Sequence, residues 1–230
     1  MAAHPKMEND AVSATHFWLI RHGETRWNAE RRLQGWRDIE LNEVGRAQAK
    51  IVARYLASDR FTARVDVILS SDLSRARDTA RQTAEHFSLP VQIDKGLRER
   101  SFGIYEGHDW TTLLGSSSAT LNLRDPRQEV EDGESLLQFQ DRIISAFEDL
   151  AQRHVRKNVL VFTHGGVIDM VWRKATRTPL EAPRPEPILN ASVNQFAIGE
   201  DRVWRLTDWG RADHLEPESA QERLMSLPAR

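Results

Sequence analysis

The chain has 230 residues, of which 29% are charged and 40% are hydrophobic, and its formal net charge is −2. This near-neutral charge gives no electrostatic basis for binding nucleic acid or an anionic membrane. The absence of cysteine excludes disulfides, thiolate metal ligands and cysteine nucleophiles. Since the first residues lack the apolar stretch of a secretory signal and no apolar run is long enough to span a bilayer, we expect one domain of a soluble cytoplasmic protein.

Apolar runs and helix-capping residues predict strands and helices that alternate along the chain. Asn42 is expected to cap a helix whose apolar face includes Ala47, and Ser135 with Gln138 forms a capping box before another helix. In chain order we expect an arm at 1–14, a strand at 16–21, a helix at 42–58, a strand at 65–71, a helix at 72–87, a strand at 91–93, a lid-like insertion at about 100–133, a helix from 136, a strand at 158–164, a helix at 165–176, a hairpin at 192–210 and a polar tail at 211–230.

This alternation predicts a single α/β domain at 15–210 with a largely parallel sheet. Sheets of this kind bind ligands beyond the carboxyl ends of their strands. Three of the predicted strands end in polar residues or glycines. These ends are Arg21-His22-Gly23, then Ser70-Ser71 with Arg75 one helical turn further on, and His164-Gly165-Gly166. We therefore expect them to meet at one edge of the sheet.

Each of these residues has an ordinary structural explanation when it is taken alone. Arg75 could pair with a neighbouring aspartate on its helix, and Glu99 could be one solvated charge among several. Together, two arginines, two histidines and helix N-termini at one edge favour the binding of an anion. Arginine matches phosphate oxygens, and a neutral imidazole forms covalent intermediates. Without a carboxylate cluster suited to Mg²⁺, the pattern favours metal-free, histidine-based phosphoryl transfer.

Five motifs, in the family's order, resemble those of the histidine phosphatase superfamily, which has the phosphoglycerate-mutase-like fold. They are LIRHGETRWN at 19–28, LQGWRDIELNEVGRAQA at 33–49, SSDLSRARDTA at 70–80, LRERSFGIYEG at 97–107 and VFTHGG at 161–166. The resemblance implies a three-layer α/β sandwich, in which a mixed, mainly parallel six-stranded sheet is flanked by helices. That fold agrees with the predicted order of elements.

The resemblance also implies a role for each matching residue. His22 would be the nucleophile that becomes phosphohistidine, and Glu99 would protonate the leaving oxygen and then activate water. The residues that would hold the phosphoryl oxygens are Arg21, Arg75, His164, Asn28 and the backbone N–H of Gly165. The residues that would border the substrate are Thr25, Gln34 and Gly35. Neither a metal nor another cofactor is implied.

Three functions stay open: a phosphomonoesterase for small phosphorylated metabolites, a cofactor-dependent phosphoglycerate mutase, and a non-catalytic module that binds a phosphorylated ligand. The binding module is disfavoured because it would have no use for Glu99. The mutases are similar to E-R-H-Y-G-x-L-x-G-x-N-K at this point, whereas this chain reads ERSFGIYEGHDW, with Phe102 at the tyrosine and Trp110 at the lysine. The following segment holds Arg124 and Arg127 but no adjacent arginine pair. We therefore favour the phosphatase.

The sequence leaves the rest of the substrate and the oligomeric state open. Side chains that could line a pocket beyond the phosphate are Trp36, Arg37, Tyr105, His108 and Trp110. The tryptophans could equally serve as packing residues. A homodimer formed through the tail and the hairpin is one option, which nothing in the sequence selects.

Overall fold

The computed structural model describes residues 14–115, 122, 125–184 and 186–216. The expected arm and tail therefore lie mostly outside the described residues, as do Arg124 and part of the expected insertion at 100–133. The described chain stays folded past residue 210. Its last strand, β6, runs over Trp204–Arg211, and a 3₁₀ turn at Asp213–Leu215 then buries His214.

The strands form one six-stranded sheet in the order β3-β2-β4-β1-β5-β6. They are β1 (Ala14–Arg21), β2 (Val67–Ser70), β3 (Val91–Ile93), β4 (Asn158–Thr163), β5 (Val193–Gly199) and β6. β3, β2, β4 and β1 pair in parallel, whereas β5 is antiparallel to both β1 and β6. The mixed, mainly parallel sheet is thus confirmed. Its central strand β4 reads NVLVFT because residues buried on both faces must be apolar.

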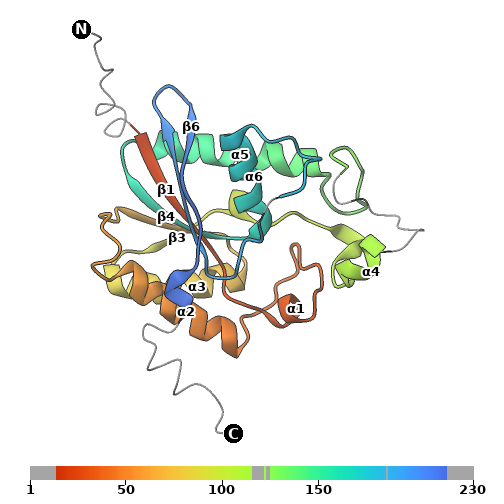
Figure 1. Cartoon of the computed structure of the whole chain (residues 1–230), viewed down its shortest axis with the longest axis horizontal. Helices are drawn as coiled ribbons and strands as arrows, with labels where there is room; N and C mark the ends of the chain where they lie inside the picture. Colours follow the sequence, from red (N-terminus) through yellow and green to blue (C-terminus); the bar gives the residue numbers. More distant parts are fainter. Residues whose placement is uncertain (1–13, 116–121, 123–124, 185, 217–230) are drawn as a thin grey trace, which may run out of the picture.

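Helices cover both faces of the sheet and give the three expected layers. The helices are α1 (Arg26–Ala29), α2 (Glu43–Leu56), α3 (Ser74–Phe87), α4 (Trp110–Gly115), α5 (Leu136–Arg153) and α6 (Gly165–Thr176). Figure 1 shows α5 and α6 on one face and α2 and α3 on the other. The predicted capping box is present at the start of α5, where Ser135 and Gln138 bind each other's backbone N–H groups. No helix of the described chain is long and apolar enough to cross a membrane.

The apolar face of α2 differs from the prediction at one position. Ala47 is exposed, whereas Ala49 and Ala53 are buried. The reason is the close approach of Gly45 to the loop after β1, where a Cβ on Gly45 would lie 1.9 Å from the carbonyl oxygen of Glu24. This contact turns the Gly45 side of the helix inward, so Ala49 and Ala53, four and eight positions later, are buried on the same side.

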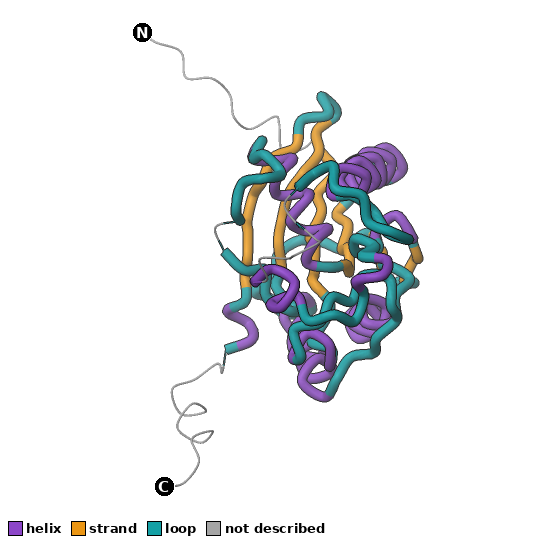
Figure 2. Tube along the Cα trace, turned by 90° about the vertical axis from the view of Figure 1, so that its right-hand side faces the viewer, coloured by secondary structure: helices purple, strands orange, loops and turns teal. Residues whose placement is uncertain are grey.

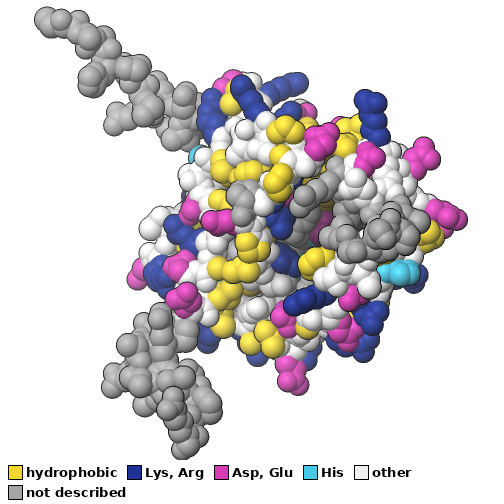
Figure 3. All heavy atoms as spheres, turned by 45° about the vertical axis from the view of Figure 1, so that its right-hand side comes forward, with side chains coloured by type: hydrophobic (Ala, Val, Ile, Leu, Met, Phe, Trp, Pro, Cys, Tyr) yellow, Lys and Arg dark blue, Asp and Glu magenta, His cyan; other side chains and the backbone are white. Residues whose placement is uncertain are grey.

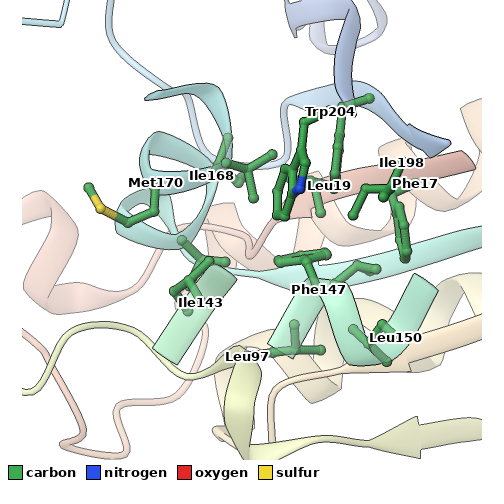
Figure 4. Packing of buried hydrophobic residues seen from close by; sticks show 14 of the residues in the cluster. Phe17, Leu19, Leu97, Ile143, Phe147, Leu150, Ile168, Met170, Ile198 and Trp204 are labelled. Atoms are coloured by element: carbon green, nitrogen blue, oxygen red, sulfur yellow. The ribbon is translucent and has the colours of Figure 1, made fainter. Parts of the chain in front are cut away.

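Two apolar cores lie on the two sides of the sheet. The larger one packs β1 against α5 and α6, and Figure 4 shows Phe147 and Ile143 of α5 close to Ile168 of α6 and Phe17 of β1. The other core joins the sheet to α2 and α3 through residues such as Val52 and Ala80. The strands that deliver the polar residues are therefore clamped from both faces, which fixes the ends of β1, β2 and β4 relative to one another.

Candidate active site

The carboxyl ends of β1 and β4 bring two histidines together, as the sequence predicts. Arg21 of β1 is paired with Thr163 of β4, and the next residues along the two strands are His22 and His164. The two imidazole rings lie 5.2 Å apart between centroids and meet edge to face. Both side chains are buried. Figure 2 looks onto this side of the molecule, where loops lie over much of the surface.

The tautomer of His22 follows from its hydrogen bond. Its Nδ1 lies 2.7 Å from the carbonyl oxygen of Gly23, and a carbonyl can only accept, so Nδ1 carries the proton. Burial, followed by the charges of Arg75 and Arg21, holds the pKa of His22 well below the ordinary value of 6.5. The ring is therefore neutral at physiological pH, with the lone pair on Nε2. A neutral imidazole with an unprotonated Nε2 is a nucleophile.

Two arginines, Arg75 buried and Arg21 half-buried, adjoin this ring without a carboxylate partner among the described residues. Arg75 in the first turn of α3 donates from Nη1 and Nη2 to the carbonyl oxygens of Arg37 and Gly35, at 2.9 and 2.8 Å. Arg21 donates from Nη1 to the carbonyl oxygen of Ile188 at 2.5 Å. Burial lowers the pKa of each guanidinium to about 10, so both remain charged at neutral pH. Unpaired buried cations are costly, and an anion between them would offset that cost.

Several buried polar atoms at this edge have no hydrogen-bond partner within the described chain. They are Nε of Arg21, Nε of Arg75 and Nδ1 of His164. The other ring nitrogen of His164 lies 2.9 Å from the hydroxyl of Ser71, at the end of β2. Burial and the charge of Arg75 lower the pKa of His164 as well. Two guanidinium N–H donors and one imidazole nitrogen near His22 thus have no hydrogen-bond partner among the described residues. The oxygens of a phosphoryl group would accept hydrogen bonds from such donors.

The amino end of α6 completes this group. His164 is the N-cap of the helix and Gly165 is its first residue, whose N–H has no partner within the helix. A Cβ at Gly165 would lie 3.4 Å from Nε of Arg21, an ordinary contact distance, so the helix end and the arginine are neighbours. Backbone N–H groups at a helix N-terminus bind anions. The predicted participation of Gly165 is therefore compatible with the geometry.

Glu99 lies beside the amino end of α6, half-buried. Its carboxylate accepts hydrogen bonds from the backbone N–H groups of Arg100 and Gly166, at 2.9 and 3.0 Å. Its carbonyl oxygen accepts from Nε1 of Trp36 at 2.8 Å and from Nη2 of Arg142 at 3.0 Å. A Cβ at Gly166 would lie 2.1 Å from Oε1 of Glu99, so any other residue there would displace the carboxylate. The carboxylate is thus held in place next to the cluster of donors.

The residues predicted to border the substrate form a network among themselves. Thr25 caps α1, where Asn28 completes a capping box, and the Thr25 hydroxyl lies 2.9 Å from Oε1 of Gln34. Gly35 has a φ of +51° and contributes its carbonyl oxygen to Arg75. A side chain at Gly35 would meet the carboxylate of Glu106. In this structure these three residues and Asn28 shape the loop after β1, and the contact of the three with substrate and of Asn28 with the phosphoryl oxygens stays a prediction.

A cavity of about 610 Å³ opens on the other side of Glu99. Trp110 of α4 lines it, whereas Trp36, Arg37, Tyr105 and His108 are not among its described lining residues. Its walls also include Leu33, Phe102, Leu136, Phe139, Met170, Leu180, Arg100 and Arg184. Figure 3 shows a hollow near the middle of this side of the molecule, with lysine or arginine atoms in it. The cavity thus adjoins the site through Glu99 and Gly166.

Four residues that contact this site had no role predicted from the sequence, although Ser71 stands at one of the strand ends expected to meet there. Thr79 donates to the carbonyl oxygen of Arg75 and accepts from the N–H of Gly23, and Asn190 donates to the carbonyl oxygen of His22. Ser71 and Arg142 hold His164 and Glu99. Thr79 and Ser71 lie inside the SSDLSRARDTA motif, which was a usable signal. Asn190 and Arg142 carry no local signal, because their contacts are made only by the tertiary fold.

The described part of the chain holds no group of three or more metal-ligating side chains that could bind a metal ion. The donors around His22 are nitrogen groups of arginine, histidine and backbone, two of them cationic. These groups suit an anion and repel a divalent cation. The prediction of a metal-free site accordingly rests on the chemistry of the donors.

Comparison with known proteins identifies relatives over almost the whole chain. The family model for the histidine phosphatase superfamily (branch 1) matches residues 17–212. Phosphoglycerate mutase-like protein 4 from Arabidopsis thaliana is 35% identical over 216 residues, which are 92% of this chain and 91% of the relative. A metal-independent phosphoserine phosphatase from the same plant is 35% identical over 206 residues, 87% and 83% of the two chains.

The fold agrees with the sequence comparison. The solved structure of a mycobacterial glucosyl-3-phosphoglycerate phosphatase matches with a TM-score of 0.75 at 29% identity, over 86% of this chain and 100% of that one. The family model covers the strand ends that carry His22 and His164, and the helix that carries Arg75. The chain belongs to the histidine phosphatase superfamily, branch 1.

Proposed function

We propose that this protein is a metal-independent phosphomonoesterase that acts on small phosphorylated metabolites through a phosphohistidine at His22. One observation carries the proposal. The neutral His22 ring has its lone pair on Nε2, and the donors around it lack acceptors. A phosphoryl group supplies acceptor oxygens for those donors and an electrophilic phosphorus for that lone pair. The cysteine-free composition suits a cytoplasmic location, which is part of the proposal.

In the first step Nε2 of His22 attacks phosphorus, and the bond from phosphorus to the ester oxygen breaks. Arg21, Arg75, His164 and the N–H of Gly165 bind the three equatorial oxygens, whose charge is dispersed in the transition state. Glu99 lies between this cluster and the cavity, where the leaving group would be. Its carboxylic acid gives a proton to the departing oxygen, and the product alcohol leaves.

In the second step water replaces the alcohol. The Glu99 carboxylate takes a proton from the water as its oxygen attacks phosphorus. The bond from phosphorus to Nε2 breaks, its electron pair returns to the ring, and inorganic phosphate is released. The hydrogen bond from Nδ1 to the Gly23 carbonyl keeps the regenerated ring in the reactive tautomer. A mutase would hold the phosphoenzyme for a second acceptor instead. This is the alternative because relatives are named as a probable phosphoglycerate mutase and as a phosphoserine phosphatase.

The decisive test uses a panel of phosphomonoesters that includes 3-phosphoglycerate and phosphoserine, with the chain treated with EDTA. We expect release of inorganic phosphate without a bisphosphoglycerate primer, and acid-labile phosphate on His22 in rapid-quench samples of a labelled substrate. Loss of turnover that Mg²⁺ restores would contradict the metal-free mechanism. Formation of 2-phosphoglycerate as the main product, dependent on primer, would replace the phosphatase with the mutase.

A further inference from the structure

The peptide group that follows His22 is held at both ends by side chains from distant elements. Its carbonyl oxygen, that of His22, accepts a hydrogen bond from Nδ2 of Asn190 at 2.9 Å. Its N–H, that of Gly23, donates to the hydroxyl of Thr79 at 3.1 Å. Asn190 lies just before β5 and Thr79 lies on α3. Two hydrogen bonds of opposite sense on one planar group fix the orientation of its plane.

Gly23 is the position at which the chain would otherwise be free to turn. It lacks a Cβ, and a Cβ there would lie 2.3 Å from the carbonyl oxygen of Gly45, so no other residue fits. Glycine permits a wider range of backbone angles than other residues. The Gly23 carbonyl is also the acceptor that fixes the proton of His22 on Nδ1. A rotation at Gly23 would therefore move the group that determines the tautomer of the nucleophile.

The turn that carries Asn190 is itself firmly held. The N–H of Ala191 donates to the carbonyl oxygen of Arg21 at 3.0 Å, and Ile188 accepts from the Arg21 side chain. Ala191 is fully buried with a φ of +56°, a conformation that alanine adopts only when its surroundings impose it. The Ala191 carbonyl oxygen accepts from Nε2 of the buried His214 at 3.0 Å. Asn190 is thus presented to His22 by a well-fixed segment.

We infer that Thr79 and Asn190 are positioning residues for the nucleophile: together they fix the peptide between His22 and Gly23, and through the Gly23 carbonyl they keep the proton on Nδ1 and the lone pair on Nε2. The inference rests on the proposed role of His22. Neither side chain needs to touch the substrate. Their effect is on the orientation of the reactive nitrogen, to which in-line attack on phosphorus is sensitive.

The chain offers a matched control for Thr79. Thr83 lies one turn further along α3 and is equally buried, but its hydroxyl has no hydrogen-bond partner among the described residues. Thr79→Val removes the hydroxyl that binds Gly23, Thr79→Ser retains it, and Thr83→Val removes one that binds nothing. Asn190→Ala removes the other hydrogen bond, together with a longer one of 3.4 Å from Nδ2 of Asn190 to Oδ1 of Asn28. The site is half-buried, so the variant can be tested even where Thr79→Val fails to fold.

We expect Thr79→Val and Asn190→Ala each to lower kcat about 10- to 100-fold, with KM changed less than about threefold. Thr79→Ser should restore most of kcat, and Thr83→Val should match the wild type. The kcat of the double variant should be little lower than that of the less active single variant, because either change alone releases the same peptide. ¹⁵N spectra of the His22 ring, assigned with His22→Ala, should show Nδ1 protonated in the wild type and a mixture of tautomers in both single variants.

Two results would overturn the inference: kcat values for Thr79→Val and Asn190→Ala that match Thr83→Val, or lowered kcat with an unchanged His22 tautomer. His22→Ala separates this failure from failure of the proposed function. If His22→Ala still turns over substrate, the proposed function is wrong. If His22→Ala is inactive while Asn190→Ala equals the wild type, only the positioning role is wrong.

Discussion

The two sides of the site are built differently. The phosphate side consists of groups at the ends of β1, β2 and β4 and the amino ends of α3 and α6, and its key side chains His22, His164 and Arg75 are buried. The leaving-group side is the cavity of about 610 Å³, whose walls come from loops, from Trp110 of the short helix α4 and from residues of α5 and α6. Trp110 on that side is 40% exposed. One side is a fixed part of the sheet, and the other is a surface hollow.

This difference separates chemistry from substrate choice. Phosphoryl transfer needs donors fixed before the substrate arrives, and burial on a clamped sheet edge provides them. The leaving group needs only a space of suitable shape next to Glu99, and loops can change without disturbing the sheet. The relatives fit this division, since proteins named as a phosphoserine phosphatase and as a glucosyl-3-phosphoglycerate phosphatase resemble one chain. Changes on the two sides should therefore have different kinetic signatures.

The largest effect is expected on the phosphate side, from His22→Ala. Removing a covalent nucleophile should lower kcat roughly 10⁴- to 10⁶-fold for every phosphomonoester, irrespective of its leaving group. Because His22 follows the end of a strand, the variant should keep the circular dichroism spectrum of the wild type. The measurement is phosphate release with several substrates. A loss confined to some substrates would mean that His22 contributes to binding the leaving group.

Glu99 stands on the border between the two sides, so its replacement should depend on the leaving group. Glu99→Gln should lower kcat roughly 10²- to 10⁴-fold with alkyl phosphates, because a general acid is lost. With p-nitrophenyl phosphate, whose leaving group needs little protonation, the first step should be less affected and labelled phosphate should accumulate on His22. Rapid quench measures it. Glu85→Gln, at an exposed position of α3, is the control. An equal loss of kcat/KM, which reports the first step alone, with both classes of substrate would contradict the acid role.

The phosphate side was also the more predictable from sequence. Its residues stand at strand ends and helix starts, where apolar runs stop, and each such signal is local. Asn190 could not be found in this way, because it contacts His22 across 168 residues of sequence. The lining of the cavity could not be predicted for the same reason. Of the five side chains that the sequence offered for a pocket beyond the phosphate, Trp110 alone lines this cavity. Thr25 and Gln34 bind each other, and their contact with substrate stays a prediction.

Two equally exposed tryptophans sharpen the comparison on the leaving-group side. Trp110 and Trp36 are each 40% exposed, but Trp110 lines the cavity whereas Trp36 donates to the Glu99 carbonyl and lies against Arg98. Trp110→Ala should lower kcat/KM about tenfold for bulky leaving groups and less than about threefold for small ones, because apolar contact with the leaving group is lost. Trp36→Ala should lower kcat for alkyl phosphates of any size. If both variants showed the same dependence on the size of the leaving group, the two tryptophans would not differ in function.

The smallest effect concerns stability, and the two histidines of the phosphate side contribute to it beside His154 and His214, whose pKa values burial also lowers. Burial lowers the pKa of both His22 and His164 below 6.5. Just below pH 6.5, each ring is therefore still neutral in the folded protein but already protonated in the unfolded chain. Between the lowered folded pKa and the unfolded value of 6.5, the unfolded chain binds more protons, and the free energy of unfolding must fall as the pH falls.

Stability is thus fully present above 6.5 and lost on acidification, by about 1.4 kcal/mol per pH unit for each histidine within that window. Urea unfolding between about pH 5 and pH 7.5 measures the slope. His164→Gln should reduce the slope by one histidine's share, whatever the variant does to stability at neutral pH, because glutamine does not titrate. A slope that His164→Gln leaves unchanged would mean that this ring is not held neutral, and the phosphate side would lose one of the features that distinguish it from the cavity.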